Sequence, residues 1–177
     1  MKMKVDSGEQ LARLFSRHVG SDWGMTNELV NYIAGKLCSH RYKGLYTPIQ
    51  LQQSKTRRLI EKAKRPFTFI CNVGRHFVCI FCTEQYLIYI DPFGKKCVQR
   101  QVRKFIHRLS RNVFYNHIPI QWFTSNHCGL YAILFALYFD RDRQDIRLQF
   151  ERASNNEHND QMCNMYLQLL LNKDNNV

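Results

Sequence analysis

The sequence predicts an α+β domain in which a mixed central sheet is flanked by helices. Three observations support this fold class. Runs of β-branched and aromatic residues cluster between positions 67 and 90, the segment 128–140 is apolar on all sides, and helical patterns stand near both ends. No internal repeat or linker separates these segments. The whole chain, residues 1–177, is therefore expected to form a single domain.

The first third of the chain is predicted to be helical. Ser7 and Gln10 form a capping-box pattern that is followed by apolar residues at helical spacing, which predicts a helix over 8–19. A short helix is expected near 27–38. Thr47, Pro48 and Gln50 repeat the N-terminal signal and start a helix that runs toward residue 64, and Pro66 marks its end.

The middle of the chain carries the strand signals. Residues 67–72, 77–82 and 86–90 are predicted strands separated by turn-type residues, and the last two form a hairpin around 83–85. Residues 112–120 are predicted to form a further strand. Beyond them, 128–140 is predicted to be a helix buried in the core, and 157–171 is the last predicted helix.

The net charge of +12 comes from two segments. Residues 54–65 contribute +5 and residues 95–111 contribute +7, while the other charges cancel. In the second segment, apolar residues recur at helical spacing and the basic residues fall on the opposite face. The apolar residues are Val98, Val102, Phe105, Ile106 and Leu109. The two segments predict a surface that binds a polyanion, which is either DNA or RNA. The predicted binding residues are Lys55, Arg57, Arg58, Arg100, Arg103, Lys104, Arg108 and Arg111. The alternative is a solvated face that only keeps the protein soluble.

Composition excludes several classes of protein. With 45% hydrophobic residues, 8 Gly and 4 Pro, the chain is neither collagen-like nor a disordered tail. The longest apolar run, 129–139, is 11 residues against the roughly 20 of a membrane span, so no span is expected. The first residues lead into polar ones, so we expect no secretory signal and an intracellular location.

The cysteines favour a reducing compartment. Seven of them, an odd number, are scattered through apolar segments, which does not suit a disulfide framework. Cys79 and Cys82 form a CxxC pair, but no second pair completes a zinc site, and a strand would place the two on opposite faces. Neither a metal nor another cofactor is expected.

Cys128 is the candidate nucleophile. It follows a polar loop and opens the predicted buried helix, where the positive end of the macrodipole and unpaired N–H groups stabilise a thiolate. The alternative interpretation is that Cys128 is a small hydrophobic residue buried in the core, which is the commoner role of an intracellular cysteine.

His76 and Asp91 are the candidate base and orienting acid. They stand near the same end of two strands joined by a hairpin, so the carboxylate can orient the imidazole. Asp91 also fits a simple turn-forming role in Asp-Pro-Phe-Gly. His127 is a rival base, but adjacent residues at a helix start seldom face each other. Gln121, just upstream of Cys128, can donate to a developing oxyanion, although most glutamines are only surface groups.

Together these segments resemble the adenovirus-type cysteine endopeptidases, the adenain family, which are relatives of the SUMO-specific proteases. The matching pieces are Gly74-Arg-His76-Phe, Tyr89-Ile-Asp91-Pro-Phe-Gly94, and Gln121 seven residues before Cys128-Gly-Leu-Tyr. The resemblance implies His76 as general base, Asp91 as its orienter, Cys128 as nucleophile and Gln121 in the oxyanion hole. It also implies an α+β fold with the cysteine on the central helix. The chain has Phe77 where the family usually has Trp.

The function that this resemblance implies is a cysteine endopeptidase, a thiol protease that cleaves viral or large DNA-transposon precursor or capsid proteins near glycine. It implies activation by DNA and by a short viral peptide, action as a monomer, and a location in the host nucleus or the virion. Two alternatives stay open. One is a protease that removes ubiquitin-like modifiers by the same chemistry, and the other is a non-catalytic nucleic-acid-binding protein.

Overall fold

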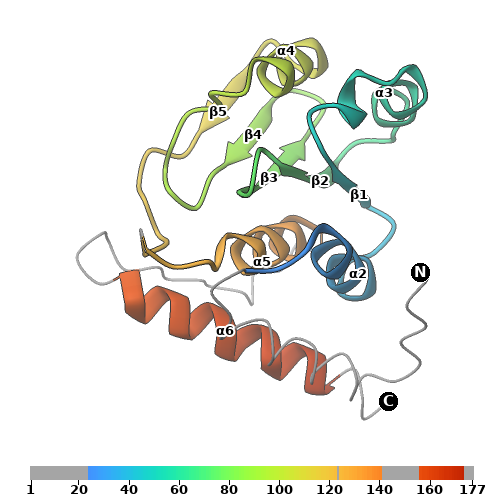
Figure 1. Cartoon of the computed structure of the whole chain (residues 1–177). Helices are drawn as coiled ribbons and strands as arrows, with labels where there is room; N and C mark the ends of the chain where they lie inside the picture. Colours follow the sequence, from blue (N-terminus) through green and yellow to red (C-terminus); the bar gives the residue numbers. More distant parts are fainter. Residues whose placement is uncertain (1–23, 123, 141–155, 174–177) are drawn as a thin grey trace.

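The computed structural model describes residues 24–122, 124–140 and 156–173, and a five-stranded sheet forms its centre (Figure 1). The strands are β1 (Tyr42–Tyr46), β2 (Phe67–Asn72), β3 (Phe77–Cys82), β4 (Leu87–Ile90) and β5 (Val113–Tyr115). They lie in sequence order across the sheet. The inner pairs, β2 with β3 and β3 with β4, are antiparallel, and the outer pairs are parallel. The mixed sheet and the hairpin between β3 and β4 confirm the predictions.

Both faces of the sheet are covered, which explains why its central strands are nearly continuous apolar runs. Along β2, Phe67, Phe69 and Cys71 face one core while Ile70 faces the other. In β3, Cys79 lies in the core with Ile70 and Cys82 lies in the opposite one. The CxxC pair is therefore split across the sheet, as strand periodicity predicts.

Helices form the outer layers. On one face lie α2 (Asn27–Leu37) and α5 (Cys128–Asp140), and α6 (Asn156–Lys173) packs against α5 from outside. On the other face lie η1 (Gln50–Gln52), α3 (Ser54–Glu61) and α4 (Arg100–Leu109). The layers follow one another as α3 with α4, the sheet, α5 with α2, and α6 (Figure 1).

Helix α5 occupies the position that its sequence predicts. It contacts β2 and β3 on one side and both α2 and α6 on others, so nearly all of its side chains are buried. Close packing at its first turn depends on Gly129, because a Cβ there would lie 3.0 Å from Val30 of α2. The helix therefore places Cys128 at the edge of the core, next to the sheet.

Several predicted elements differ from the structure. The helix expected from 48 to 64 is two pieces, η1 and α3, because Gln53 between them is extended. Strand β1 was not predicted, and the strand expected over 112–120 is only β5. Val98 precedes α4 and is 82% exposed, so it does not belong to the apolar face of that helix. The helix predicted over 8–19 lies outside the described residues.

In the described part of the chain, no helix combines the length and the apolar character that a membrane span requires. Within those same ranges, no group of three or more His, Cys, Asp or Glu side chains is arranged to hold a metal ion.

Candidate active site

His76 and Asp91 meet at one end of the β3–β4 hairpin, each just outside its strand. The His76 Nε2 atom lies 2.7 Å from Asp91 Oδ1. A tight turn delivers His76 to this place, because Gly74 and Arg75 both have positive φ and the amide of Val73 donates to the His76 carbonyl at 2.8 Å. The hairpin thus brings together two residues that are 15 positions apart, as the sequence predicts.

Phe93 fixes both members of this pair. Its ring stacks on the His76 imidazole with the ring centroids 4.8 Å apart, and its backbone N–H donates to Asp91 Oδ1 at 2.7 Å. The same oxygen therefore accepts hydrogen bonds from the imidazole and from the backbone. This arrangement limits rotation of both side chains and holds the imidazole at a single angle.

Asn116, which directly follows β5, anchors the backbone of Asp91. Its Oδ1 accepts the Asp91 N–H at 2.8 Å, and its Nδ2 donates to the Asp91 carbonyl at 2.7 Å. Sequence reasoning missed this role because the contact spans 25 residues. The available signal was an Asn inside a predicted strand, where Asn is disfavoured unless its side chain has a specific partner.

The Cys128 thiol is close enough to His76 to raise the pKa of the imidazole, through a side-chain hydrogen bond and through its charge. Because Nε2 is engaged by Asp91, Nδ1 is the ring nitrogen that can serve the thiol. Cys128 is 8% exposed and Asp91 is 4% exposed. The candidate base, its candidate orienting acid and the candidate nucleophile at a helix start thus lie together in one largely buried place.

The environment of His76 favours the imidazolium form. Burial lowers the pKa of His76, but hydrogen bonds to Asp91 and to Cys128, and the charges of these two groups, raise it to about 9. At neutral pH the ring therefore holds its proton.

Gln121 lies on the loop that leads into α5, and it is 1% exposed. Its Nε2 donates to the Ser125 carbonyl at 2.7 Å and contacts Ser125 Oγ at 3.2 Å. The backbone N–H groups of Ile120 and Gln121 both donate to the Pro92 carbonyl, at 2.9 and 3.1 Å. The loop of Gln121 is therefore fastened to the turn that carries Asp91.

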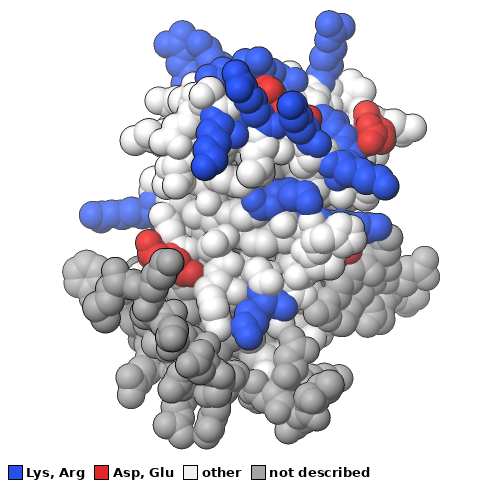
Figure 2. Space-filling view, turned by 90° about the vertical axis from the view of Figure 1, so that its right-hand side faces the viewer, with Lys and Arg blue, Asp and Glu red and all other residues white. Residues whose placement is uncertain are grey.

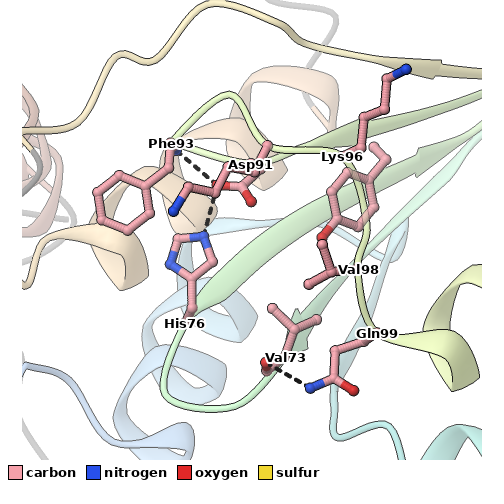
Figure 3. A pocket seen from close by; sticks show the side chains of 9 residues that line it. Val73, His76, Asp91, Phe93, Lys96, Val98 and Gln99 are labelled. Atoms are coloured by element: carbon pink, nitrogen blue, oxygen red, sulfur yellow. Dashed lines mark hydrogen bonds and ion pairs between the residues drawn. The ribbon is translucent and has the colours of Figure 1, made fainter.

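A cavity of about 220 Å³ opens beside the His76–Asp91 pair (Figure 3). Apolar atoms form most of its walls, and its polar lining residues are His76, Asp91, Lys95, Lys96 and Gln99. Gln99 extends across its base and donates from Nε2 to the Val73 carbonyl at 3.3 Å. This hydrogen bond ties the segment before α4 to the turn that delivers His76.

The predicted polyanion-binding residues lie on α3 and α4, on the face of the sheet opposite α5, except Arg111, which follows α4. Figure 2 shows that Lys and Arg gather on the part of the molecule that these helices form. An ion pair of 2.8 Å between Arg108 and Glu61 joins the two helices. Arg57 is only half exposed and donates to the Gln52 carbonyl. The exposed members, which we call the basic surface, are Lys55, Arg58, Arg100, Arg103, Lys104, Arg108 and Arg111.

His127, the rival base, faces a different partner. Its Nδ1 lies 3.5 Å from Asp160 Oδ2 of α6. The loop before Cys128 is thus in contact with α6, a helix in which sequence reasoning identified no site residue.

Comparison with solved structures identifies the fold. The chain has the fold of the SUMO protease Ulp1. It superposes on the C-terminal Ulp1 protease domain in complex with Smt3, the yeast orthologue of SUMO, with a TM-score of 0.53 and 10% identity over 93% of this chain and 95% of that one. Ulp1 with its catalytic cysteine oxidised to a sulfonic acid gives a TM-score of 0.55 and 9% identity over 98% of each chain. A de-sumoylating protease gives a TM-score of 0.52 and 9% identity over 93% and 86%.

No protein-family model matches the chain, and no curated protein sequence matches it either. At this level of identity, the likeness establishes the α+β cysteine-protease fold, and the activity must be argued from the site.

Gly94 provides a test of how the Asp91 turn supports the site. Its φ is +65°, and a Cβ there would lie 2.7 Å from the backbone nitrogen of Pro119 and 2.8 Å from the Ile118 carbonyl carbon. We expect Gly94→Ala to push this loop away and to lower the free energy of unfolding by more than about 1 kcal/mol. Urea denaturation checks this value. Gly35→Ala is the matched control, because a Cβ at Gly35 meets nothing within 4 Å.

Proposed function

We propose that the protein is a cysteine endopeptidase in which Cys128 is the nucleophile, His76 the general acid and base, and Asp91 the orienting acid. The single observation that carries this proposal is the position of His76, which bonds Asp91 through Nε2 at 2.7 Å and also reaches the Cys128 thiol. A buried cysteine with only a packing role has no need of an imidazole that is held by a carboxylate.

In this mechanism the Cys128 thiolate attacks the carbonyl carbon of the scissile peptide bond. The imidazolium of His76 then gives its proton to the leaving amine, and a thioester between Cys128 and the acyl part of the substrate remains. Water, deprotonated by the now neutral His76, attacks the thioester and releases the acid and the Cys128 thiolate, which restores the thiolate–imidazolium pair. Asp91 keeps the ring in one orientation through both steps.

The negative charge that develops on the carbonyl oxygen needs hydrogen-bond donors. The backbone N–H of Cys128, at the start of α5, and the side-chain amide of Gln121 are the proposed donors. Gln121 is buried on the loop that leads into this helix, and its amide nitrogen is held by Ser125. The proposed role therefore requires that one N–H of the Gln121 amide turns from Ser125 toward the oxyanion when substrate binds.

For the substrate, we propose viral or transposon precursor proteins that are cleaved near glycine. The pattern of His76, Asp91, Gln121 and Cys128 resembles the adenain family, and the basic surface suits a protease that works next to nucleic acid.

A second candidate substrate is a protein joined to a ubiquitin-like modifier. This alternative is favoured by the neighbour structure in which the Ulp1 protease domain is in complex with the SUMO orthologue Smt3. Both candidates use the same chemistry, so they differ only in what the protein recognises outside the scissile bond.

A substrate panel separates the two candidates. We expect cleavage of precursor-type peptides that contain glycine at the scissile bond, with turnover that Cys128→Ala abolishes. Fusions of ubiquitin-like modifiers to a reporter protein form the second arm, and initial rates are compared at equal concentrations. Efficient cleavage of the fusions alone would replace the first candidate with the second.

We propose in addition that a polyanion such as duplex DNA binds the basic surface and raises the protease rate. The support is electrostatic, since residues 95–111 contain seven bases and no acid. Neutralisation of phosphates by these side chains releases counterions, which makes the binding sensitive to salt and largely independent of sequence.

Lys104→Glu tests this proposal. Lys104 lies on the exposed face of α4, so its reversal should weaken binding of duplex DNA and lower the slope of log affinity against log salt by about 1. Fluorescence anisotropy with labelled duplex measures both quantities. Lys36→Glu on α2 makes the same charge change on the other face of the sheet and should leave the slope unchanged. Equal effects of both variants would mean that the net charge, and no particular surface, attracts the DNA.

A further inference from the structure

Two consecutive residues of α6, Asn159 and Asp160, are buried against the loop that leads into α5. Asn159 is 1% exposed and Asp160 is 5% exposed. Figure 1 shows the N-terminal part of α6 lying alongside this region of the molecule. Neither side chain belongs to the Cys128–His76–Asp91 set or to the basic surface.

These two residues hold the backbone on either side of Gln121. Asn159 Nδ2 donates to the carbonyl of Ile120 at 3.0 Å, and the N–H of Trp122 approaches Asp160 Oδ1 at 3.5 Å. Ile120 directly precedes Gln121 and Trp122 directly follows it. The backbone that carries Gln121 is thus held by α6 on both sides of this residue.

The same helix also reaches the other end of the loop. Asp160 Oδ2 lies 3.5 Å from Nδ1 of His127, the residue before Cys128. Asp160 Oδ1 accepts the hydroxyl of Tyr131 at 2.7 Å, and Tyr131 lies one turn into α5. One carboxylate therefore connects the backbone beside Gln121, the residue before Cys128 and the first turn of the helix that carries Cys128.

Stability alone does not account for a carboxylate in this place. Burying an ionised carboxylate is costly, and hydrogen bonds that satisfy it mainly offset that cost. Two of the contacts of Asp160 are instead to residues next to a proposed oxyanion donor, since Trp122 follows Gln121 and His127 precedes Cys128. The third contact, with the Tyr131 hydroxyl, is to the first turn of the helix that begins with Cys128. A rigid oxyanion site requires its two donors to keep a constant separation.

We propose that Asn159 and Asp160 are positioning residues, which hold the Gln121 amide and the Cys128 N–H at the separation that the oxyanion of the reaction needs. This inference rests on the proposed cysteine-protease function. It assigns to α6 a role in catalysis that acts through the loop and leaves the Cys128–His76 pair itself unaffected.

The test compares a reaction that needs the oxyanion donors with one that does not. Asp160→Asn keeps the shape of the side chain but removes its charge. We expect kcat for peptide hydrolysis to fall about 10²-fold, toward the loss expected for Gln121→Ala, with KM changed less than about threefold. Alkylation of Cys128 by iodoacetamide should stay within about threefold of the wild-type rate, because it requires the thiolate and no oxyanion donor.

Asp140→Asn is the matched control. Asp140 is 4% exposed, lies at the far end of α5, and accepts hydrogen bonds from the Ser39 N–H and hydroxyl at 2.6 and 2.8 Å. Its replacement should lower the melting temperature without a selective loss of kcat. The inference is overturned if Asp160→Asn hydrolyses peptide at the wild-type rate, or if its alkylation and hydrolysis rates fall in parallel.

A milder variant is used if Asp160→Asn does not fold. Tyr131→Phe keeps the ring and removes the hydroxyl, whose partners are Asp160 Oδ1 at 2.7 Å and the Ile120 carbonyl at 3.1 Å. Both contacts hold the same loop, so this variant should show the same selective loss of kcat to a smaller extent. Equal loss of alkylation and hydrolysis in this variant also overturns the inference.

Failure of the proposed function is distinguishable from failure of this inference. A peptide aldehyde reports on the oxyanion donors without hydrolysis, because the Cys128 sulfur adds to its carbonyl carbon and the thiol proton moves to the oxygen or to His76. If the wild type binds the aldehyde but cleaves no peptide, the proposed function fails, and weaker aldehyde binding by Asp160→Asn still supports the inference. Equal aldehyde affinity in both proteins contradicts it.

Discussion

Cys128→Ala is expected to lower kcat/KM for peptide cleavage by at least about 10⁴-fold, because no other group can form the thioester intermediate. The removed thiol is the one that reaches His76. Removal of a single sulfur atom at a site that is 8% exposed should leave the fold intact. Steady-state kinetics measures the loss, and the circular dichroism spectrum with the melting temperature establishes that the variant is folded.

Cys38→Ser is the control for this substitution. Cys38 is a half-buried thiol that follows α2, and it lies outside the His76–Asp91 site. Its replacement should leave kcat/KM within about threefold of wild type. If Cys128→Ala retained full activity, while Lys104→Glu abolished the function of the protein, the reading as a non-catalytic nucleic-acid-binding protein would take precedence.

The second large effect is expected in the pH dependence. The pKa of His76 is about 9, above its ordinary value of 6.5, so the protonated ring is the favoured form of the folded protein. Its contribution to stability is therefore fully present below pH 6.5 and is lost as the pH rises through about 9. Activity should follow the same group, because above this pH the imidazolium no longer supplies a proton to the leaving amine. We expect kcat/KM to decline above about pH 9.

Asp91→Asn should move this alkaline limb to lower pH and lower kcat/KM by about 10²-fold. Without the carboxylate, two of the causes that raise the pKa of His76 are removed while the burial that lowers it stays. Asp140→Asn, which removes a buried carboxylate at the other end of α5, should leave the limb in place. An alkaline limb that Asp91→Asn does not move would show that the limb belongs to a group other than His76.

The sequence patterns were most informative where local periodicity and burial agree. The predicted α5 has the observed bounds, since thirteen residues without a polar face can only lie inside the core. Strand β1 escaped prediction because its five residues are all half-buried and Gly44, with φ of +107°, interrupts the pattern. Its place in the sheet depends on parallel pairing with β2, a contact that no local pattern reports.

In the candidate site, too, local patterns predicted some residues, while others could be found only from the structure. His76 and Asp91 could be paired from the sequence because a hairpin joins their strands. The roles of Phe93 and Asn116 are set by a ring contact and by a hydrogen-bond pair across the sheet. Asp160 reaches the loop from 38 residues away in the chain, so only the packing of α6 on α5 could reveal it.

The central claim is that Cys128 and His76 form an activated pair, and the most direct measurement is the alkylation rate of each of the seven cysteine thiols by mass spectrometry across pH. The account predicts that Cys128 is labelled fastest, that its labelling persists at low pH, and that His76→Ala removes this advantage. Labelling of Cys128 at the rate of the other thiols, unchanged by His76→Ala, would contradict the account.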